Sequence, residues 1–400
     1  MLPLDDLLVF DLSRVLSGPF CSMYLADFGA RVIKVERPGE GDDTRAFGPP
    51  FVGGESTYFM SINRNKESLA IDLKAPEGQH IAREIAARAD VLLENFRPGA
   101  LDRLGLDYGS LRAANPKLIY ASISGFGHFG LPEHSRRPGY DLVAQGLGGL
   151  QSLTGEADGS PLKCGVSIAD LVSGLHALVG VLVALHARTR TGRGQHVDVS
   201  MLDGQIALLT YHAGAFLATG KVPSRMGNRH PSIVPYETYR ARDGWLNLAV
   251  GNDALFEIFA RDILAAPGLV ADARFTTNAA RVAHRDELNA ILVPLIAAGT
   301  LADWLERLDR AGVPAGPIYT VAEALAHPQV AARGMIAELD HPSAGKVRVA
   351  GVPVRLSETP GAVRTPPPRV GEQTRAVLGE LLGMGEAELT RLTAEGVIAG

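Results

Sequence analysis

The strongest candidate for chemistry in this sequence is Asp170, a carboxylate near the start of a long apolar segment in the middle of the chain. From residue 167 to about 187, leucine and valine recur at helical spacing with small residues between them, which predicts a buried helix that is apolar nearly all round. A carboxylate at a helix start commonly accepts backbone N–H groups as an N-cap. The same donors would hold it ionised and ready to attack an acyl carbon. Gly174, one turn on, would leave room for a ligand.

Basic residues near the ends of predicted strands form a second candidate site. In open α/β sheets, ligands bind at the carboxyl edge of the strands. Guanidinium groups bind phosphate oxygens well, so clustering at this edge indicates a phosphate-bearing ligand, although a single arginine on a loop needs no function. The residues are Arg14, Arg37, Lys66, Arg97, Arg103, Arg136 and Arg137.

The elements that must position these residues alternate between strands and helices. A strand at 7–12, a glycine-containing turn, a helix ending at Asp27 and a strand at 30–36 form a βαβ unit, which predicts a parallel sheet of Rossmann-like type. No Gly-x-Gly-x-x-Gly follows the first strand, which argues against a nicotinamide or flavin site. Further strands are predicted at 68–73, 91–94, 118–124 and 196–200, and helices at 76–89, around Arg103 and at 201–219.

The pattern changes after about residue 221. Residues 231–240 and 245–250 predict two antiparallel strands around a turn, followed by shorter helices. We therefore expect an α/β large domain at 1–221 and a smaller α+β domain at 222–325. In the remaining segment, 326–400, residues 345–351 predict a strand, residues 365–369 an extended connector, and two short helices close the chain.

Composition limits the classes of function. The chain has 400 residues, 46% of them hydrophobic, which allows a large subunit interface, and a net charge of −5, which gives no basic face for nucleic acid. Its two cysteines and scattered histidines form neither a disulfide framework nor a metal-ligand set. The first residues carry acid where a signal peptide needs base. We expect a cytoplasmic protein without a metal, a nucleic-acid partner or a membrane partner.

Several motifs, taken in order, resemble the class III CoA-transferase family (CaiB/BaiF type) along essentially the whole chain. They lie at residues 10–19, 29–43, 65–66, 94–99 and 191–195, together with Asp170 at its helix start. Residues 42–51, 55–58, 63–66 and 230–236 are most similar to members that move CoA from succinyl-CoA to glutarate. The resemblance implies an intertwined homodimer, in which the segment 326–400 of each subunit returns to complete the Rossmann-like large domain.

The resemblance also implies roles for individual residues. Asp170 would be the nucleophile and form covalent aspartyl intermediates while CoA moves from an acyl-CoA donor to a carboxylic acid acceptor such as a dicarboxylate. Coenzyme A is then a substrate, and no permanently bound cofactor is expected. Positions that match CoA contacts are Leu16, Ser17, Arg37, Leu73, Lys74, Asn95, Phe96, Arg97, Arg103, Arg137 and Tyr140. For the distal carboxylate of a dicarboxylate we expect Arg14, Arg45, Arg229 or His230.

Two other functions stay open. An isomerase of the α-methylacyl-CoA racemase branch would carry a catalytic His in a Gly-His-Asp sequence, where this chain has Tyr140, and tyrosine is a poor base near neutral pH. A non-catalytic CoA-binding protein would use Asp170 only as a helix cap. Within the family, residues 250–253 lack the glycine run of the formyl-CoA transferase branch, which disfavours formyl and oxalyl substrates.

Overall fold

The chain forms two compact units in the computed structural model, which describes residues 1–400. Unit 1 comprises Met1–Leu150, Lys163–Gly220 and Pro328–Gly400, and unit 2 comprises Gln151–Leu162 and Lys221–His327. The short segment Gln151–Leu162 departs from the expected ranges, because it precedes residue 221 but belongs to the second unit.

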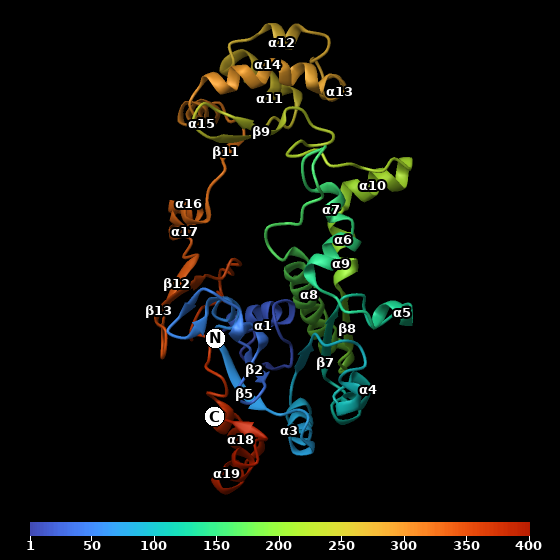
Figure 1. Cartoon of the computed structure of the whole chain (residues 1–400), viewed down its shortest axis with the longest axis vertical. Helices are drawn as coiled ribbons and strands as arrows, with labels where there is room; N and C mark the ends of the chain where they lie inside the picture. The colour runs from blue at the N-terminus through green and yellow to red at the C-terminus, as the bar shows by residue number, and fades with distance from the viewer. The chain divides into compact units, whose positions relative to one another are not determined.

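A seven-stranded sheet forms the centre of unit 1, in the order β14-β5-β2-β1-β6-β7-β8 (Figure 1). Every neighbouring pair is parallel except β14, which runs antiparallel to β5. The predicted parallel-sheet core is therefore confirmed. The strands are β1 (Leu8–Asp11), β2 (Arg31–Glu36), β5 (Lys66–Ile71), β6 (Val91–Glu94), β7 (Ile119–Ser124), β8 (His196–Ser200) and β14 (Ile398–Ala399).

Helices cover both faces of this sheet, so its strands are buried on both sides. Along β1, Val9 belongs to the core shared with α1 (Ser17–Asp27) and α8 (Ile168–Thr191). The next residue, Phe10, belongs to the opposite core, to which α3 (Pro76–Ala86), α4 (Tyr108–Ala114), α18 (Thr374–Leu382) and α19 (Glu386–Ala394) contribute.

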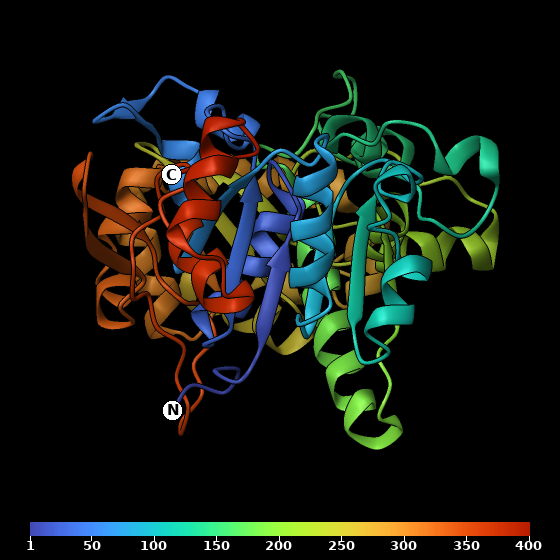
Figure 2. The same ribbon diagram turned by 90° about the horizontal axis from the view of Figure 1, so that it is seen from below.

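The end of the chain packs against β5, far away in the sequence. Thr374 Oγ1 accepts a hydrogen bond from the backbone N–H of Ala70 (3.0 Å), and Gln373 Oε1 accepts one from that of Ser68 (2.8 Å). In Figure 2 the red C-terminal helices lie beside the blue first strands. The sequence predicted the two closing helices but not the two-residue strand β14.

Helix α8 is longer and less buried than predicted. Its small and branched residues, such as Ala177 and Val181, face the sheet. On the other side Val179 and Val183 are 58% and 61% exposed. By length and composition α8 is a helix that could cross a membrane, but it packs on α1, β7 and β8 as one layer of the α/β fold. The expected burial all round is therefore wrong, and an uncovered apolar face remains.

Gly174 has a different role from the predicted one. It is buried, and a Cβ atom there would lie 2.6 Å from the backbone oxygen of Ser17 and 3.3 Å from the Phe20 ring. The missing side chain therefore makes room for α1 rather than for a ligand. This close approach fixes the start of α1 against the first turns of α8.

Other local predictions also differ from the structure. The helix expected over 201–219 is two helices, α9 (Met201–Leu208) and α10 (Thr210–Thr219), because Thr210 has a φ of 40°, outside the helical range. Arg103 lies in the 3₁₀ turn η2 (Asp102–Leu104) rather than in an α-helix. The remaining elements of unit 1 are η1 (Asp43–Ala46), β3 (Phe51–Val52), β4 (Glu55–Ser56), α2 (Thr57–Ile62), α5 (Pro132–Ser135), α6 (Asp141–Leu147), α17 (Pro328–Ala332), β12 (Ile336–His341) and β13 (Gly345–Ala350). Helix α7 (Leu150–Leu153) begins with the last residue of this stretch of unit 1 and continues into the segment assigned to unit 2.

Unit 2 is a three-stranded antiparallel sheet packed on helices. The predicted hairpin is present as β9 (Tyr236–Arg240) and β10 (Trp245–Ala249), although β9 starts later than expected. A third strand, β11 (Ala315–Pro317), pairs with β10 and was not predicted. The helical elements are α11 (Asp253–Ile258), the π-helical η3 (Phe259–Ile263), α12 (Gly268–Ala271), α13 (Asn278–Ala283), α14 (Arg285–Ala298), α15 (Leu301–Arg310) and α16 (Val321–Ala326).

Candidate active site

A cavity of about 480 Å³ lies at the carboxyl edge of the large sheet. The loops that follow β1, β2, β6 and β7 line it, together with the start of α8. Strand β1 pairs with β2 on one side and β6 on the other, so the direction of strand order reverses here. Open α/β sheets bind ligands at such a switch point.

The cavity brings together predicted residues that are far apart in the sequence. Its wall also includes residues that sequence reasoning missed as site residues, among them Val15, Asp43, Asp141 and Met201. For Asp141 a signal was present, because it directly follows Tyr140 and precedes the central helix. The predicted residues that line the cavity are Arg14, Ser17, Asn95, Phe96, Arg97, Arg137, Tyr140 and Asp170.

Asp170 is the third residue of α8 and does not cap it. The N-cap position is Ser167, and no protein group donates a hydrogen bond to the Asp170 carboxylate or forms an ion pair with it. Burial, and then the negative charge of Asp141, raise the pKa of Asp170 to about 7. The helix-cap interpretation is therefore wrong. The carboxylate lines the cavity without protein donors, and a raised pKa makes the ionised form of a carboxylate more basic, a property that suits a nucleophile.

Asn95 fixes the turn that follows β1. Its Oδ1 accepts from the backbone N–H of Arg14 (2.8 Å), and its Nδ2 donates to the Arg14 backbone oxygen (2.6 Å) and to Ser17 Oγ (3.3 Å). Arg14 is thereby held on the cavity wall, with its guanidinium carbon 4.9 Å from the centre of the Phe96 ring. Its ion pair with Asp43 is long, 3.4 Å, and uses only one terminal nitrogen. The other nitrogens stay available to an anion.

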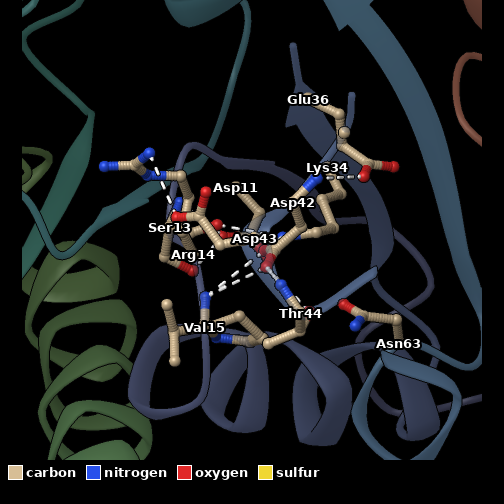
Figure 3. A network of polar contacts seen from close by, with 12 residues as sticks. Asp11, Ser13, Arg14, Val15, Lys34, Glu36, Asp42, Asp43, Thr44 and Asn63 are labelled. Atoms are coloured by element: carbon tan, nitrogen blue, oxygen red, sulfur yellow. Dashed lines mark hydrogen bonds and ion pairs between the residues drawn. The ribbon is translucent and has the colours of Figure 1, made fainter. Parts of the chain in front are cut away.

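A buried ion pair joins the loop after β2 to the same turn (Figure 3). Lys34 Nζ donates to Asp42 Oδ2 (2.7 Å) and to the Ser13 backbone oxygen (3.0 Å), and both charged side chains are fully buried. Asp42 also accepts from the backbone N–H groups of Thr44 (2.9 Å) and Val15 (3.3 Å). Val15 has a φ of 67°, which is strained for a β-branched residue. The pair thus stabilises a strained part of the cavity wall.

Arg37 and Arg45 occupy the same loop in different ways. Arg37 is half exposed and pairs with Asp43 (2.5 Å), a residue of the cavity wall. Arg45 is nearly buried, forms two hydrogen bonds with Glu36 (2.6 and 2.7 Å) and lies 3.6 Å from the centre of the Phe59 ring. Because these contacts use its guanidinium inside the protein and it does not line the cavity, the expected contact of Arg45 with a substrate carboxylate is not supported.

The other predicted CoA contacts of unit 1 lie outside the cavity wall. Leu16 is buried in a small cluster with Met23 and Ile62. The turn after β5 carries Leu73 and the exposed Lys74, and Arg103 is exposed on η2.

Three basic or imidazole side chains lie in other surroundings. Lys66, grouped above with the phosphate-binding candidates, is buried at the start of β5 and donates to the Pro19 backbone oxygen (2.9 Å), so it does not reach a ligand. Arg229 and His230 belong to unit 2, where Arg229 pairs with Asp286 (3.1 Å) and Glu237 (3.4 Å).

Comparison with known proteins assigns the family. The model of CoA-transferase family III matches residues 4–374. The chain belongs to CoA-transferase family III. It is therefore an enzyme that transfers CoA, and the predicted family is confirmed.

Relatives of this family III enzyme resemble it over nearly their whole length. Mouse succinyl-CoA:glutarate CoA-transferase is 43% identical over 398 residues, which are 100% of this chain and 91% of the relative. Acetyl-CoA:oxalate CoA-transferase of Acetobacter aceti is 45% identical over 385 residues, 94% of this chain and 95% of the relative. The crystal structure of a CaiB/BaiF family protein from Brucella suis superposes with a TM-score of 0.84 at 44% identity, covering 95% of this chain and 99% of that one.

The buried Lys34–Asp42 pair gives a pH-dependent prediction. Burial alone would raise the pKa of Asp42, but the Lys34 ammonium and the Thr44 donors lower it to about 2. Replacing Asp42→Ala leaves a buried cation unpaired, so we expect the free energy of unfolding at pH 7 to fall by about 3–5 kcal/mol. A carboxylate whose folded pKa is depressed stabilises the fold above its unfolded pKa, near 3.8, and loses this effect toward pH 2.

Thermal and urea unfolding between pH 7 and pH 2 measure this difference. The gap between wild type and Asp42→Ala should narrow as the pH falls from about 4 to 2. Glu40→Gln on the same loop is the control, because Glu40 is exposed and its pair with Arg37 contributes little. A gap that stays constant down to pH 2 would show that the Asp42 charge does not stabilise the fold.

Proposed function

We propose that this enzyme moves CoA from succinyl-CoA to a dicarboxylate such as glutarate, through covalent intermediates on Asp170. The observation that carries the proposal is a half-buried carboxylate without hydrogen-bond donors in a cavity that also presents Arg14, Arg97 and Arg137. The reactions named for the mouse and Agrobacterium fabrum relatives support this substrate pair.

The proposed chemistry balances without a net proton or redox change. An Asp170 oxygen attacks the thioester carbonyl carbon. The C–S bond then breaks, the CoA thiolate leaves with the electron pair of that bond, and the acyl group remains on Asp170 as a mixed anhydride. The thiolate attacks the Asp170 carbonyl carbon, which gives an aspartyl-CoA thioester and frees the donor carboxylate. The acceptor carboxylate repeats the two steps in reverse, forming a new anhydride that the thiolate opens on the acceptor side. Asp170 leaves the cycle as a free carboxylate.

Charged residues of the cavity suit the two ends of the substrates. We assign the exposed Arg97 and Arg137 to CoA phosphates, with Arg37 behind Asp43. Ser17, Asn95, Phe96 and Tyr140 would line the path of the pantetheine arm, and Leu16, Leu73, Lys74 and Arg103 remain proposed CoA contacts on family resemblance alone. Arg14 is our choice for the distal carboxylate, because the other candidate of unit 1, Arg45, is paired internally.

The apolar side of α8, with parts of α9 and α10, needs a cover. We propose that a second copy of the chain supplies it as the intertwined homodimer that the resemblance implies. The exposed apolar residues there are Leu175, Val179, Leu182, Val183, Ile206, Leu208, Phe216 and Leu217. Leaving so many apolar side chains of adjoining helices in water is unfavourable, and a contiguous patch of this kind marks an interface.

We also propose a cytoplasmic location. Both cysteines, Cys21 and Cys164, are free thiols, which agrees with a reducing compartment. Succinyl-CoA and CoA as substrates require no membrane or nucleic-acid partner.

Mass spectrometry of the acid-quenched enzyme tests the role of Asp170. After mixing with succinyl-CoA, wild type should carry a CoA-sized adduct on the peptide that contains Asp170, and hydroxylamine should remove it. Asp170→Ala and the isosteric Asp170→Asn should bind CoA but form no adduct and lose at least about 10³-fold in kcat. An adduct that persists in both variants, or full activity in either, would contradict the assignment.

Steady-state kinetics separate the proposed roles of two arginines. We expect Arg14→Ala to raise the KM for glutarate by about 10-fold or more, because a charge-assisted hydrogen bond is lost, and to leave the KM for succinyl-CoA nearly unchanged. Arg37→Ala should do the opposite. Oxalate should be assayed beside glutarate, since one relative is named for it. An unchanged glutarate KM in Arg14→Ala would remove Arg14 from the substrate site.

Sedimentation and light scattering test the homodimer. Wild type should behave as a dimer, whereas Val179→Glu combined with Val183→Glu should give a smaller species or an insoluble one, because two charges would enter the apolar contact. Glu84→Ala with Arg88→Ala, an exposed ion pair at the C-terminal end of α3, is the control and should stay dimeric. A monomeric wild type would disprove the proposed cover.

A further inference from the structure

Asp141 lies beside the nucleophile and is tied to the segment that carries it. Its Oδ1 accepts a hydrogen bond from the backbone N–H of Ala169 (2.9 Å), the residue immediately before Asp170. Its Oδ2 accepts from Nε2 of Gln145 (2.8 Å), one turn further along α6. Gln145 is completely buried, and its Oε1 accepts from the backbone N–H of Cys164 (2.8 Å). The backbone at Cys164 and at Ala169 is thus held on α6 by a chain of three hydrogen bonds through Gln145 and Asp141, which we call the relay.

The relay works only with an acceptor-only group at position 141. The relay starts at the backbone N–H of Ala169 and ends at the backbone N–H of Cys164, and both of these groups donate. Between them lie the side chains of Asp141 and Gln145. Gln145 can satisfy Cys164 with its oxygen only if its NH₂ group points at position 141. Position 141 must then accept at two separate atoms, Oδ1 and Oδ2, which a carboxylate does and an amide, with one oxygen and one NH₂ group, does not. The hydrogen-bond pattern therefore requires a side chain at position 141 with two accepting oxygens.

The two neighbouring carboxylates differ in how they are satisfied. Asp141 has one donor on each oxygen, whereas Asp170 has none. This agrees with the raised pKa of Asp170, to which Asp141 contributes after burial.

We propose that Asp141, backed by Gln145, is a positioning residue of the transferase reaction, which holds the backbone before Asp170 and keeps a fixed negative charge beside its carboxylate. The proposal rests on the proposed role of Asp170 as nucleophile. Its consequence for chemistry is a more basic attacking carboxylate held in one place.

Other charged groups face Asp170 as well and must be considered in any pH profile. The cavity wall contributes Arg14, Asp43, Arg97, Arg137 and the Tyr140 hydroxyl. From α2, Tyr58 is close enough that the charge of Asp170, after burial, helps to raise the pKa of the Tyr58 hydroxyl to about 12. Among these, Asp43 is already paired with Arg14 and Arg37, so Asp141 is the carboxylate whose removal should act most directly on Asp170.

A single and a double variant separate geometry from charge. Asp141→Asn keeps the acceptor for Ala169 but turns an NH₂ group toward the Gln145 amide, so it breaks the relay and removes the charge. Combining Asp141→Asn with Gln145→Glu restores every hydrogen bond, because the new amide at position 141 donates to a carboxylate that also accepts from Cys164. In this double variant the negative charge has moved one turn along α6, from position 141, whose charge acts on Asp170, to position 145.

The readouts are kcat, the pH dependence of kcat/KM for succinyl-CoA, and adduct formation on Asp170, all with full-length enzyme. In wild type the active form is ionised, so kcat/KM should fall as the pH drops through about 7. Asp141→Asn should lower kcat by about 10- to 100-fold through misplacement of the nucleophile, and move the acid midpoint to lower pH. The double variant should recover most of the lost kcat while its midpoint stays below that of wild type.

The outcomes are distinguishable. Wild-type kcat and midpoint in Asp141→Asn would overturn the proposal, and so would a wild-type midpoint in the double variant. If the single variant does not fold, the double variant alone decides through its midpoint, since its hydrogen bonds are complete. Absence of an Asp170 adduct in wild type would instead refute the proposed function, whereas a normal adduct together with unaffected variants would refute only the role of Asp141.

Discussion

Three neighbouring strands of the large sheet each end in a buried carboxylate that accepts a hydrogen bond from the backbone of the following loop. Asp11 ends β1 and accepts from the N–H of Ser13 (2.9 Å), Glu36 ends β2 and accepts from that of Asp42 (2.8 Å), and Glu94 ends β6 and accepts from that of Phe96 (2.8 Å). A sheet covered on both faces leaves only this edge for polar groups, and each buried acid is stable only if donors satisfy it. The loops are therefore held where the cavity needs them.

Asp170, the proposed nucleophile, differs from these acids because it has no hydrogen-bond donor. Each acid at a strand end has at least one backbone donor and stabilises the loop that follows it, and Asp42 likewise pairs with Lys34 (2.7 Å). Asp170 is half-buried without any donor, an arrangement that costs free energy and that a protein keeps at a functional site. The close contact between Gly174 and α1 holds this unfavourable group in place, because α8 cannot slide relative to the cavity loops without a clash.

Short sequence patterns were enough to predict the βαβ core, the central helix and Asp170, because strand and helix periodicity and family motifs can be recognised within a few residues. The interaction partners of charged side chains could not be predicted in this way. In the sequence, Lys66 and Arg45 look available to bind an anionic ligand. The structure shows that Lys66 instead donates to the Pro19 backbone oxygen and that Arg45 forms an ion pair with Glu36. The strand β14 escaped prediction because two residues carry no periodicity and gain their structure from β5, more than three hundred residues away.

The sequence also did not predict that one side of α8 is uncovered. An apolar helix is expected to be buried, but its sequence does not show which part of the protein, or which partner, buries each side. In one chain its inner face meets the sheet, and its outer face has the same character. A second copy would remove this surface from water and would also restrict the motion of α8, whose first turn carries Asp170, the proposed nucleophile. Covering the apolar face and fixing the reactive carboxylate would then be one event, so assembly and activity of this transferase should be coupled through α8.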